Sequence, residues 1–407
     1  MNVNEAAAPS AAYRPLMKWA KTLAFGAIGL FVLYRGHLAQ PSQYLGAGRW
    51  LYLAVGGLAL LAAVLCARDR LPNSAQSVLL SGLISALFLD LVFSQVDFAR
   101  MWEAFVGLSY VYFIPSTVLL LLSSVIRAYR WKWFFPTDVR SSFWSRLSAL
   151  SIGVAANQVL PARAGEFIRA YVFGRRTQMS KTTVFATVVL ERVFDGLNVL
   201  FFLVVVALLI GVHSPEIQYM GLAGAGFYIG AIALLVTIHF RKTWLEGQVR
   251  RWLPGVASQK ALGLLRAFAD GLSVIRSARQ LTAVAALSLL CWLVIAASFW
   301  PILSAFNFGA PVPLYTPLLL VAALGLGLML PAAPAGVGIF QYACVLTLQV
   351  VFAPYHGSLA ADFAEQAAAF ALVVHAAQVT PEILLGVICF LAEGLSWREV
   401  SVSGERA

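Results

Sequence analysis

Long apolar runs separated by short basic or polar segments make up most of the 407-residue chain. A helix of about 20 mostly apolar residues spans the roughly 30 Å hydrocarbon core of a bilayer. Runs of this kind predict membrane-spanning helices over residues 50–66, 75–94, 104–126, 183–211, 219–239, 281–305 and 366–392. A shorter run over 16–34 predicts one more span, with Lys18 and Lys21 extending toward the lipid headgroups. We therefore expect an all-α polytopic membrane protein with about eight transmembrane helices.

Two further apolar segments, 147–173 and 317–353, are each interrupted by proline and glycine. Proline removes a backbone donor and breaks a helix, and unpaired backbone groups are tolerated at membrane depth only where protein or a wet cavity covers them. Each segment therefore predicts a re-entrant hairpin. The two breaks also resemble each other, since residues 160–165 read LPARAG and residues 330–336 read LPAAPAG.

The spans beside the two hairpins match in their order along the chain. Spans 104–126 and 183–211 flank the first hairpin, while spans 281–305 and 366–392 flank the second in the opposite orientation. This order predicts an inverted-topology repeat with two opposed hairpins. Many transporters place a substrate site near the bilayer midplane among the broken helices of such a repeat.

Composition and charge agree with a membrane protein and predict its orientation. The chain is 60% hydrophobic and only 12% charged, which excludes an ordinary soluble domain. With a cytoplasmic N-terminus, most of the 29 lysines and arginines lie on the cytoplasmic side, the largest group between Arg127 and Lys181. The net charge of +11 then indicates a cytoplasmic face that meets anionic lipid, not nucleic acid. We expect a multi-pass protein of the bacterial plasma (inner) membrane with both termini in the cytoplasm.

Charged residues occur inside the predicted span 183–211. Glu191, Asp195 and Asn198 share one helix face by their spacing, and Arg192 can reach Asp195 three residues further on. Charged groups in a bilayer are costly unless they are paired or hydrated, so these side chains should face the protein interior or a cavity. Both a substrate site and an internal salt bridge that only holds helices together fit this pattern.

The first hairpin carries a second group of charges. Arg163, Glu166 and Arg169 follow one another at three-residue intervals and can line one side of a short helix after Pro161. A helix N-terminus at this break would direct free amide donors toward an anion such as a lipid phosphate. The alternative is a basic loop at the cytoplasmic headgroups.

Other polar groups within apolar segments are Asp90, His375, Gln378 and Glu382. Hydrogen bonding between helices is the favoured interpretation for them, and a functional role is the alternative. The segment 260–279 predicts an amphipathic helix lying on the cytoplasmic leaflet. The four cysteines lack metal-ligand spacing and are interpreted as small hydrophobic residues. We expect neither a metal nor a cofactor.

Four sequence elements occur in a characteristic order: RAYRWKWFF (127–135), NQVLPARAGEFIRAYVF (157–173), ERVFDG (191–196) and LPAAPAGVGIF (330–340). In this order and spacing they resemble the transmembrane flippase domain of the lysylphosphatidylglycerol synthase family. The resemblance covers about residues 78–395 and leaves the two N-terminal spans, within residues 1–75, outside it. It implies that these residues are family motif positions: Pro161, Arg163, Gly165, Glu166, Arg169, Arg192 and Asp195.

In bifunctional members of this family, the resembling domain moves an aminoacylated phospholipid to the outer leaflet, and a separate soluble domain makes that lipid. Here residues 396–407 are expected to form only a short cytoplasmic tail, which implies a stand-alone member without the synthase domain. Stand-alone relatives are associated with hopanoid, glycolipid and other envelope lipids. The sequence departs from the family at Gln341, where an acidic residue is common, so the resemblance does not extend to a carboxylate on the second hairpin.

The favoured function is a lipid translocator without enzymatic activity, in which a polar cleft between the hairpins takes a headgroup while the acyl chains stay in lipid. Its arginines would hold phosphate and its carboxylates would orient the arginines. The candidate substrate-binding residues are Asn157, Pro161, Arg163, Gly165, Glu166, Arg169, Glu191, Arg192, Asp195, Pro331, Pro334, Gly336 and Gly338.

The sequence is also compatible with two other functions. One is a membrane enzyme that acts on a lipid-linked substrate, with Glu166 and Asp195 as an acid and base pair. The other is a non-catalytic partner of envelope-lipid enzymes. The expected binding partner of the translocator is an anionic phospholipid, a hopanoid or an isoprenoid-linked lipid, and a homo-oligomer is left open.

Overall fold

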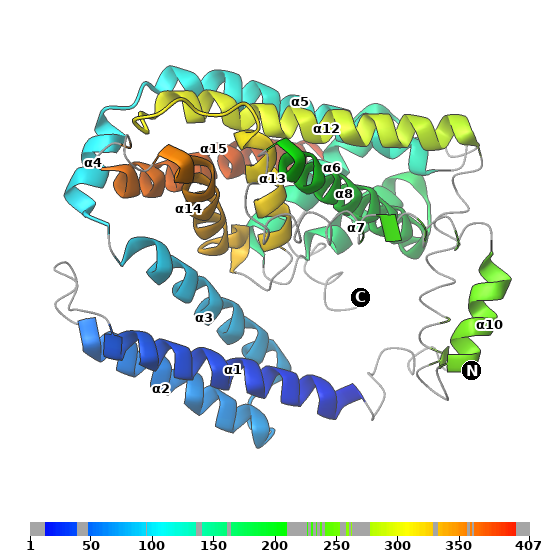
Figure 1. Cartoon of the computed structure of the whole chain (residues 1–407). Coiled ribbons are helices and arrows are strands. Elements are labelled where there is room, and N and C mark those ends of the chain that lie inside the picture. Colours follow the sequence, from blue (N-terminus) through cyan, green and yellow to red (C-terminus); the bar gives the residue numbers. More distant parts are fainter. Residues whose placement is uncertain are drawn as a thin grey trace. The chain divides into compact units, whose positions relative to one another are not determined.

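The computed structural model describes most of the chain, and the described residues are mainly helical (Figure 1). The described residues are 13–38, 48–94, 96–135, 141–160, 164–209, 241–252, 277–328, 333–355 and 362–395, with isolated positions at 226, 229–230, 233, 237, 258–259, 262 and 359. No strand is assigned among these residues, which confirms the all-α class. The chain divides into an N-terminal unit, Met1–Asp97 with Leu328–Tyr342, and a main unit, Phe98–Gly327 with Ala343–Ala407.

Six helices within the described residues are long and apolar enough to cross a membrane: Ala75–Phe93, Tyr110–Phe134, Thr183–Leu209, Arg279–Ala305, Pro334–Tyr355 and Phe363–Ala392. Five of them correspond to predicted spans. The predicted span 219–239 lies almost wholly outside the described residues, as do most of the amphipathic segment 260–279 and the tail 396–407. The count of eight spans therefore stays a prediction.

The N-terminal unit contains α1 (Tyr13–Leu38), α2 (Gly48–Ala67) and α3 (Asn73–Phe93). Helices α1 and α2 lie side by side (Figure 1), and they approach closely because glycine is present at the crossing. A Cβ on Gly29 would meet Leu60 and the carbonyl of Gly56. Both helices were predicted as spans. The described side chains of α2, Tyr52–Ala67, form a shorter apolar helix, and α1, which carries Lys18, Lys21 and Arg35, is not among the six long apolar helices.

One polar network joins the three N-terminal helices. Arg35 of α1 donates from Nη2 to the Asp90 Oδ2 of α3 at 3.0 Å and to Ser94 Oγ at 3.2 Å, and the hydroxyl of Tyr52 on α2 donates to the other Asp90 oxygen. Asp90, one of the intramembrane polar groups in the sequence, is therefore neutralised by its own unit.

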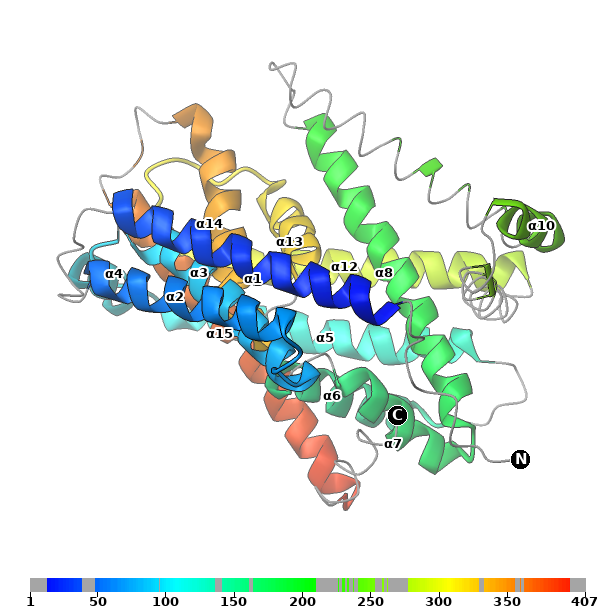
Figure 2. The same cartoon turned by 90° about the horizontal axis from the view of Figure 1, so that it is seen from below.

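The main unit is built around a long helix pair, α5 (Phe113–Trp131) and α12 (Ala278–Ala305), which lie side by side in both views (Figures 1 and 2). The Ser116 hydroxyl of α5 donates to the carbonyl of Ser298 on α12 at 2.8 Å. The same unit contains α4 (Phe98–Val106), α8 (Lys181–Leu209), α10 (Lys242–Trp252), α13 (Thr316–Gly327) and α15 (Phe363–Ala392). The 3₁₀ turns η2 (Tyr110–Tyr112) and η3 (Lys132–Phe134) extend α5 at its two ends.

The third predicted span, 104–126, begins and ends later than expected. The chain turns at Gly107 and separates α4 from α5, so the long apolar helix runs from Tyr110 to Phe134. The prediction ended at the first basic residue. In the structure the helix continues through Arg127 and Arg130, because both side chains find carboxylates inside the protein.

The first break lies between α6 (Phe143–Val159) and α7 (Gly165–Thr177). The two helices have 17 and 13 residues, so each is shorter than the roughly 20 residues of a full span. They pack with backbones in close contact, because a Cβ on Gly153 would meet the Gly165 carbonyl at 2.8 Å and a Cβ on Gly165 would overlap Gly153. This helix pair fits the predicted first hairpin, whose depth in a bilayer stays a prediction.

The second break precedes α14 (Ile339–Phe352) and contains the 3₁₀ turn η5 (Pro334–Gly336). Ala335, Gly336 and Gly338 have φ values of 58°, 71° and 89°. These are left-handed conformations, in which glycine is favoured. Because Pro334–Tyr355 also qualifies as a span by length and composition, the second re-entrant hairpin likewise stays a prediction.

Candidate functional site

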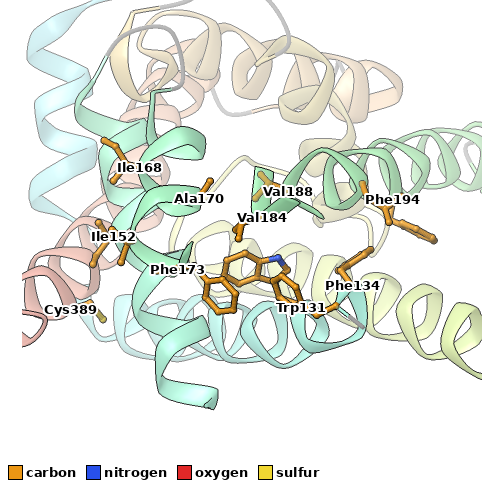
Figure 3. Close-up of a cluster of buried hydrophobic side chains, with 14 of the residues drawn as sticks. Trp131, Phe134, Ile152, Ile168, Ala170, Phe173, Val184, Val188, Phe194 and Cys389 are labelled. Carbon is orange, nitrogen blue, oxygen red and sulfur yellow. The ribbon is translucent and has the colours of Figure 1, made fainter. Parts of the chain in front are cut away.

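A cluster of buried hydrophobic side chains, many of them aromatic, lies within the main unit (Figure 3). The rings of Trp131 and Phe173 lie 4.6 Å apart, and the edge of Phe134 contacts Phe194. Val184 and Val188 of α8 fill the same core. Helices α5, α7 and α8 are thereby held close together, which brings their charged side chains into one cluster.

The carboxylate of Glu191, on α8, is the centre of this cluster. Its side chain is fully buried. Arg169 of α7 binds it with two hydrogen bonds, from Nη1 to Oε1 at 3.0 Å and from Nη2 to Oε2 at 2.8 Å. Arg192 Nη2 lies 2.6 Å from Oε1, and Nη2 atoms of Arg130 and Arg127 lie 3.4 and 3.5 Å from it.

A second carboxylate, Asp195, lies one helical turn further along α8. Arg130 Nη1 donates to its Oδ1 at 2.9 Å, and the indole Nε1 of Trp292 on α12 donates to the same oxygen at 3.1 Å. Arg192 Nη2 lies 3.2 Å from Oδ2, which confirms the contact expected from the three-residue spacing. Ser288 of α12 accepts from Arg130 Nη1 at 2.8 Å.

We refer to the group Arg127, Arg130, Glu166, Arg169, Glu191, Arg192 and Asp195 as the arginine cluster. It combines four arginines with three carboxylates and so carries one excess positive charge at neutral pH. Glu166 is its most loosely held member, with Oε1 3.8 Å from Arg192 Nε. Burying unpaired ions costs several kcal/mol each, so the close pairing of the inner members is required for the fold.

The arginine cluster has a buried side and a more accessible side. The side chains of Arg130 and Arg169 are 0% and 4% exposed, whereas those of Arg127, Glu166 and Arg192 are 14%, 21% and 37% exposed. On the buried side, Nε of Arg130 and Nε of Arg169 have no hydrogen-bond partner among the described residues. Phosphate oxygens are strong acceptors for arginine, and the accessible side is where such a group could bind.

Arg169 is also positioned by an aromatic ring. Its guanidinium carbon lies 3.8 Å from the ring centroid of Trp131, and the Trp131 indole donates to Thr187 Oγ1 of α8 at 3.0 Å. Arginine suits this position because its planar group can stack on a ring and bind a carboxylate in two places at once.

Two predicted site residues near the first break have structural contacts. The side-chain oxygen Oδ1 of Asn157 accepts from the backbone N–H of Gly165 at 2.8 Å, and so binds one of the free donors at the start of α7. Gly165 is buried against Gly153 and Asn157, where a side chain would not fit. Pro161 and Arg163 lie outside the described residues, as does Pro331 of the second break.

The remaining predicted site residues surround the second break, within the N-terminal unit. Ser85 Oγ of α3 accepts from the Ala333 N–H at 3.0 Å, and Gly338 lies directly against the Ser85 backbone. Gln341 Oε1 accepts from the Gly338 N–H at 2.8 Å. Gln341 is the third residue of α14, so this contact is one half of a capping box, which needs only an acceptor. The neutral residue at this family position therefore fulfils a capping role.

Three polar residues of α15 were predicted as functional or as structural hydrogen-bonding groups. Gln378 Nε2 donates to Ser298 Oγ of α12 at 2.9 Å, which is a contact between helices, and His375 is buried. Glu382 Oε2 accepts from Gln158 Nε2 at 2.8 Å, and Gln158 is in the last turn of α6, just before the first break.

Sequence reasoning missed Arg127 and Arg130 as site residues and assigned them to the cytoplasmic face. The available signal was their three-residue spacing at the end of a helix, within the family-like element RAYRWKWFF. Ser288 and Trp292 were not anticipated either, since nothing in the sequence connects α12 with α8. No cluster of three or more metal-ligating side chains occurs in the part of the chain that the structure describes.

Comparisons with known proteins agree with a membrane protein. Residues 78–386 match the family described as "Lysylphosphatidylglycerol synthase TM region". The chain is 29% identical over 123 residues to a UPF0104 membrane protein of Methanocaldococcus jannaschii, an alignment that covers 30% of this chain and 37% of that relative. No solved structure matches. The family match and the apolar helices identify a multi-pass membrane protein.

Proposed function

Since the chain belongs to the lysylphosphatidylglycerol synthase transmembrane family, we propose that it is a lipid translocator, which moves a phospholipid or another envelope lipid between leaflets. The family places the protein in a lipid-related process. The proposal adds that this chain itself moves the lipid across the membrane.

The observation that carries the proposal is the accessible side of the arginine cluster. Arg127 and Arg192 keep partly exposed side chains, and both contact the carboxylates of α8 through Nη2, so that Nη1 of each guanidinium could bind an anion. A lipid phosphate offers several acceptor oxygens to such donors, and arginine binds phosphate in a planar, two-point geometry. The excess positive charge of the cluster would be neutralised by one phosphate negative charge.

The same arrangement suggests how a headgroup is released. Glu166 at 3.8 Å from Arg192 is the weakest ion pair of the cluster, so a phosphate could replace it at Arg192 and leave when Glu166 returns. The buried pair of Arg169 with Glu191 holds α7 against α8 and keeps the site in place. The acyl chains would remain in the surrounding lipid throughout, so the site need hold only the headgroup.

The partner under this proposal is a phosphate-bearing envelope lipid, either an anionic phospholipid or an isoprenoid-linked lipid; a hopanoid without phosphate would not use the arginines. We further propose that the protein lies in the bacterial inner membrane with both termini in the cytoplasm. It is proposed not to be an enzyme. The second candidate function is a non-catalytic partner of lipid enzymes, in which the arginine cluster only holds the helices together. The complete burial of Arg130 and Glu191 favours this alternative.

The test measures leaflet exchange of fluorescent phospholipids in proteoliposomes, with a membrane-impermeant quencher that reports the outer leaflet. Arg127→Ala and Arg192→Ala should each slow exchange by about tenfold or more, since one charge-assisted hydrogen bond contributes about 1.5–3 kcal/mol. Arg176→Ala is the matched control, because Arg176 forms an exposed ion pair with Glu393 away from the cluster. Glu166→Gln should alter release and therefore also change the rate.

Two results would argue against the proposal in different ways. If the double variant Arg127→Ala, Arg192→Ala exchanges lipid as fast as the parent protein, the arginine cluster is not the headgroup site. Exchange no faster than in protein-free vesicles, across anionic, zwitterionic, isoprenoid and hopanoid lipids, would favour the non-catalytic partner.

A further inference from the structure

Glu382 is an acidic residue deep within a helix that can span a membrane. It belongs to α15, in the apolar stretch Phe363–Ala392, and lies ten residues from Ala392, or about 15 Å along the helix axis. Its one hydrogen bond among the described residues comes from the neutral amide of Gln158 at 2.8 Å. No lysine, arginine or histidine of the described chain forms an ion pair with it.

Three other acids within long apolar helices, Asp90, Glu191 and Asp195, differ from Glu382 in this respect. Glu191 and Asp195 each have an arginine nitrogen within 3 Å, and Asp90 has Arg35 at 3.0 Å. An ionised carboxylate without a cation is costly in a low-dielectric setting, and protonation removes that cost. Acids of this kind form proton relays in pumps and transporters.

One cation of the arginine cluster acts on Glu382 from a neighbouring helix. Helix α5, which carries Arg127, packs against α15, so Arg127 can act on the Glu382 carboxylate from a neighbouring helix, although the two side chains are not within ion-pair distance. Arg127 is also the arginine held farthest from Glu191, at 3.5 Å. Among the described residues, Arg127 from α5 and Gln158 from α6 are the groups that act on Glu382, and α4 and α12 contribute no titratable side chain to it. Arg127 is therefore next to the carboxylates of the arginine cluster on one helix and within electrostatic reach of Glu382 on another.

The backbone around Glu382 connects it with the first break. Pro381 precedes it inside α15 and removes one helix hydrogen bond. One turn later, Gly386 packs directly on the Ser151 carbonyl and on Ala155 of α6. Gln158 lies in the last turn of the same helix, so the Gln158–Glu382 contact joins the end of α6 to a locally weakened point of α15.

We propose that Glu382 is a proton-binding site that couples headgroup binding at Arg127 to the protonation of α15. When Glu382 is ionised, its charge draws Arg127 away from the arginine cluster. When a hydronium ion transfers its proton to a Glu382 carboxylate oxygen, an O–H bond forms there, water is left, and Arg127 is free to bind phosphate. The proton returns to water when the headgroup leaves. The coupling rests on the proposed phosphate site, whereas the protonation of Glu382 does not.

The direction of the pH effect follows from this competition. Proton binding at Glu382 and phosphate binding at Arg127 favour each other, and such coupling is reciprocal. Phosphate-lipid affinity should therefore be highest at acid pH and fall by up to about tenfold per pH unit above the titration midpoint of Glu382, since one proton is bound with each headgroup.

The first measurement asks whether Glu382 titrates at all. Infrared difference spectra of the purified protein between about pH 5 and pH 8 should contain the carbonyl band of a protonated carboxyl group that Glu382→Gln removes. Glu393→Gln at the end of α15 is the control and should leave that band in place. Gln158→Leu should move the midpoint to higher pH, because the ionised form loses its amide donor. Absence of any band that depends on Glu382 overturns the proposal.

The second measurement follows the binding of phosphatidylglycerol through the fluorescence of tryptophans beside the cluster, Trp131 and Trp292. In the parent protein the affinity should fall as pH rises, and in Glu382→Gln it should stay at its acid value. An affinity with the same pH dependence in both proteins overturns the coupling, even if the protein exchanges lipid. If the protein exchanges no lipid, the proposed translocator fails, and these two measurements still decide whether Glu382 binds a proton linked to phosphate.

Discussion

Arg169 and Glu191 form a two-point ion pair between α7 and α8, with nitrogen–oxygen distances of 3.0 and 2.8 Å. Arg169 comes from the helix that follows the first break, and Glu191 comes from the first third of the apolar span Thr183–Leu209. This pair anchors the break to the adjacent span, and the other members of the arginine cluster gather around it.

Replacing Arg169 by lysine should destabilise the protein although the charge is kept. Lysine cannot make both hydrogen bonds to Glu191 and cannot stack its charge flat on Trp131. The expected loss in unfolding free energy is about 1–3 kcal/mol, measured as a lower thermal midpoint in detergent. A midpoint equal to that of the parent would mean that the two-point geometry contributes nothing.

Glu191→Gln should be more severe, because up to four arginines lose their shared negative charge. Breaking a buried ion pair from one side typically costs about 3–5 kcal/mol. Asp69→Asn serves as the comparison, since Asp69 pairs with Lys18 but its side chain is 75% exposed, where a pair contributes only about 0–1 kcal/mol. Similar thermal midpoints for the two variants would contradict the central role of Glu191.

Gly165→Ala should disrupt the packing of α6 on α7. Its methyl group would overlap the Gly153 carbonyl and the Asn157 side chain, and overpacking of this kind costs about 1–3 kcal/mol. Gly196→Ala, in α8, is the control because nothing lies within 4 Å of its new methyl group; it should be neutral or slightly stabilising. Comparable expression and thermal stability of both variants would exclude a tight α6–α7 contact.

Gln341→Glu and Gln341→Leu should behave differently. Glutamate keeps an acceptor for the Gly338 N–H and should leave the start of α14 intact, whereas leucine leaves that donor unpaired. Loss of a cap costs about 0.5–2 kcal/mol, and limited proteolysis near the second break should be faster in the leucine variant. Equal proteolysis of the two variants would show that the cap is not required.

Much of the helical framework could be predicted from the sequence. The spans 75–94, 183–211, 281–305 and 366–392 correspond closely to α3, α8, α12 and α15, because twenty apolar residues in a row have few alternatives to a membrane helix. The shared face of Glu191 and Asp195 was likewise predictable, since both residues are on one helix and the period of 3.6 residues sets their direction.

The arginine cluster could be predicted only in part. Arg192 was matched with Asp195 from local spacing, but Arg127 and Arg130 were placed in the cytoplasm because a basic residue normally marks the end of a span. Their partners are more than sixty residues away in the chain, and no periodicity reveals such a contact. Asn157 stays a predicted substrate-binding residue; its local contact, the hydrogen bond that it accepts from the Gly165 N–H, was not predicted.

Hydropathy, proline and glycine act locally on the backbone, so the sequence alone indicates an all-α membrane protein with broken apolar segments and intramembrane charges. It does not indicate which charges neutralise one another. Helices α5, α7 and α8 supply the arginine cluster, α12 hydrogen-bonds to it, and among the described residues Glu382 is paired with an amide and with no cation. Electrostatic pairing depends on distance in space, and distance in space is set by how the helices pack.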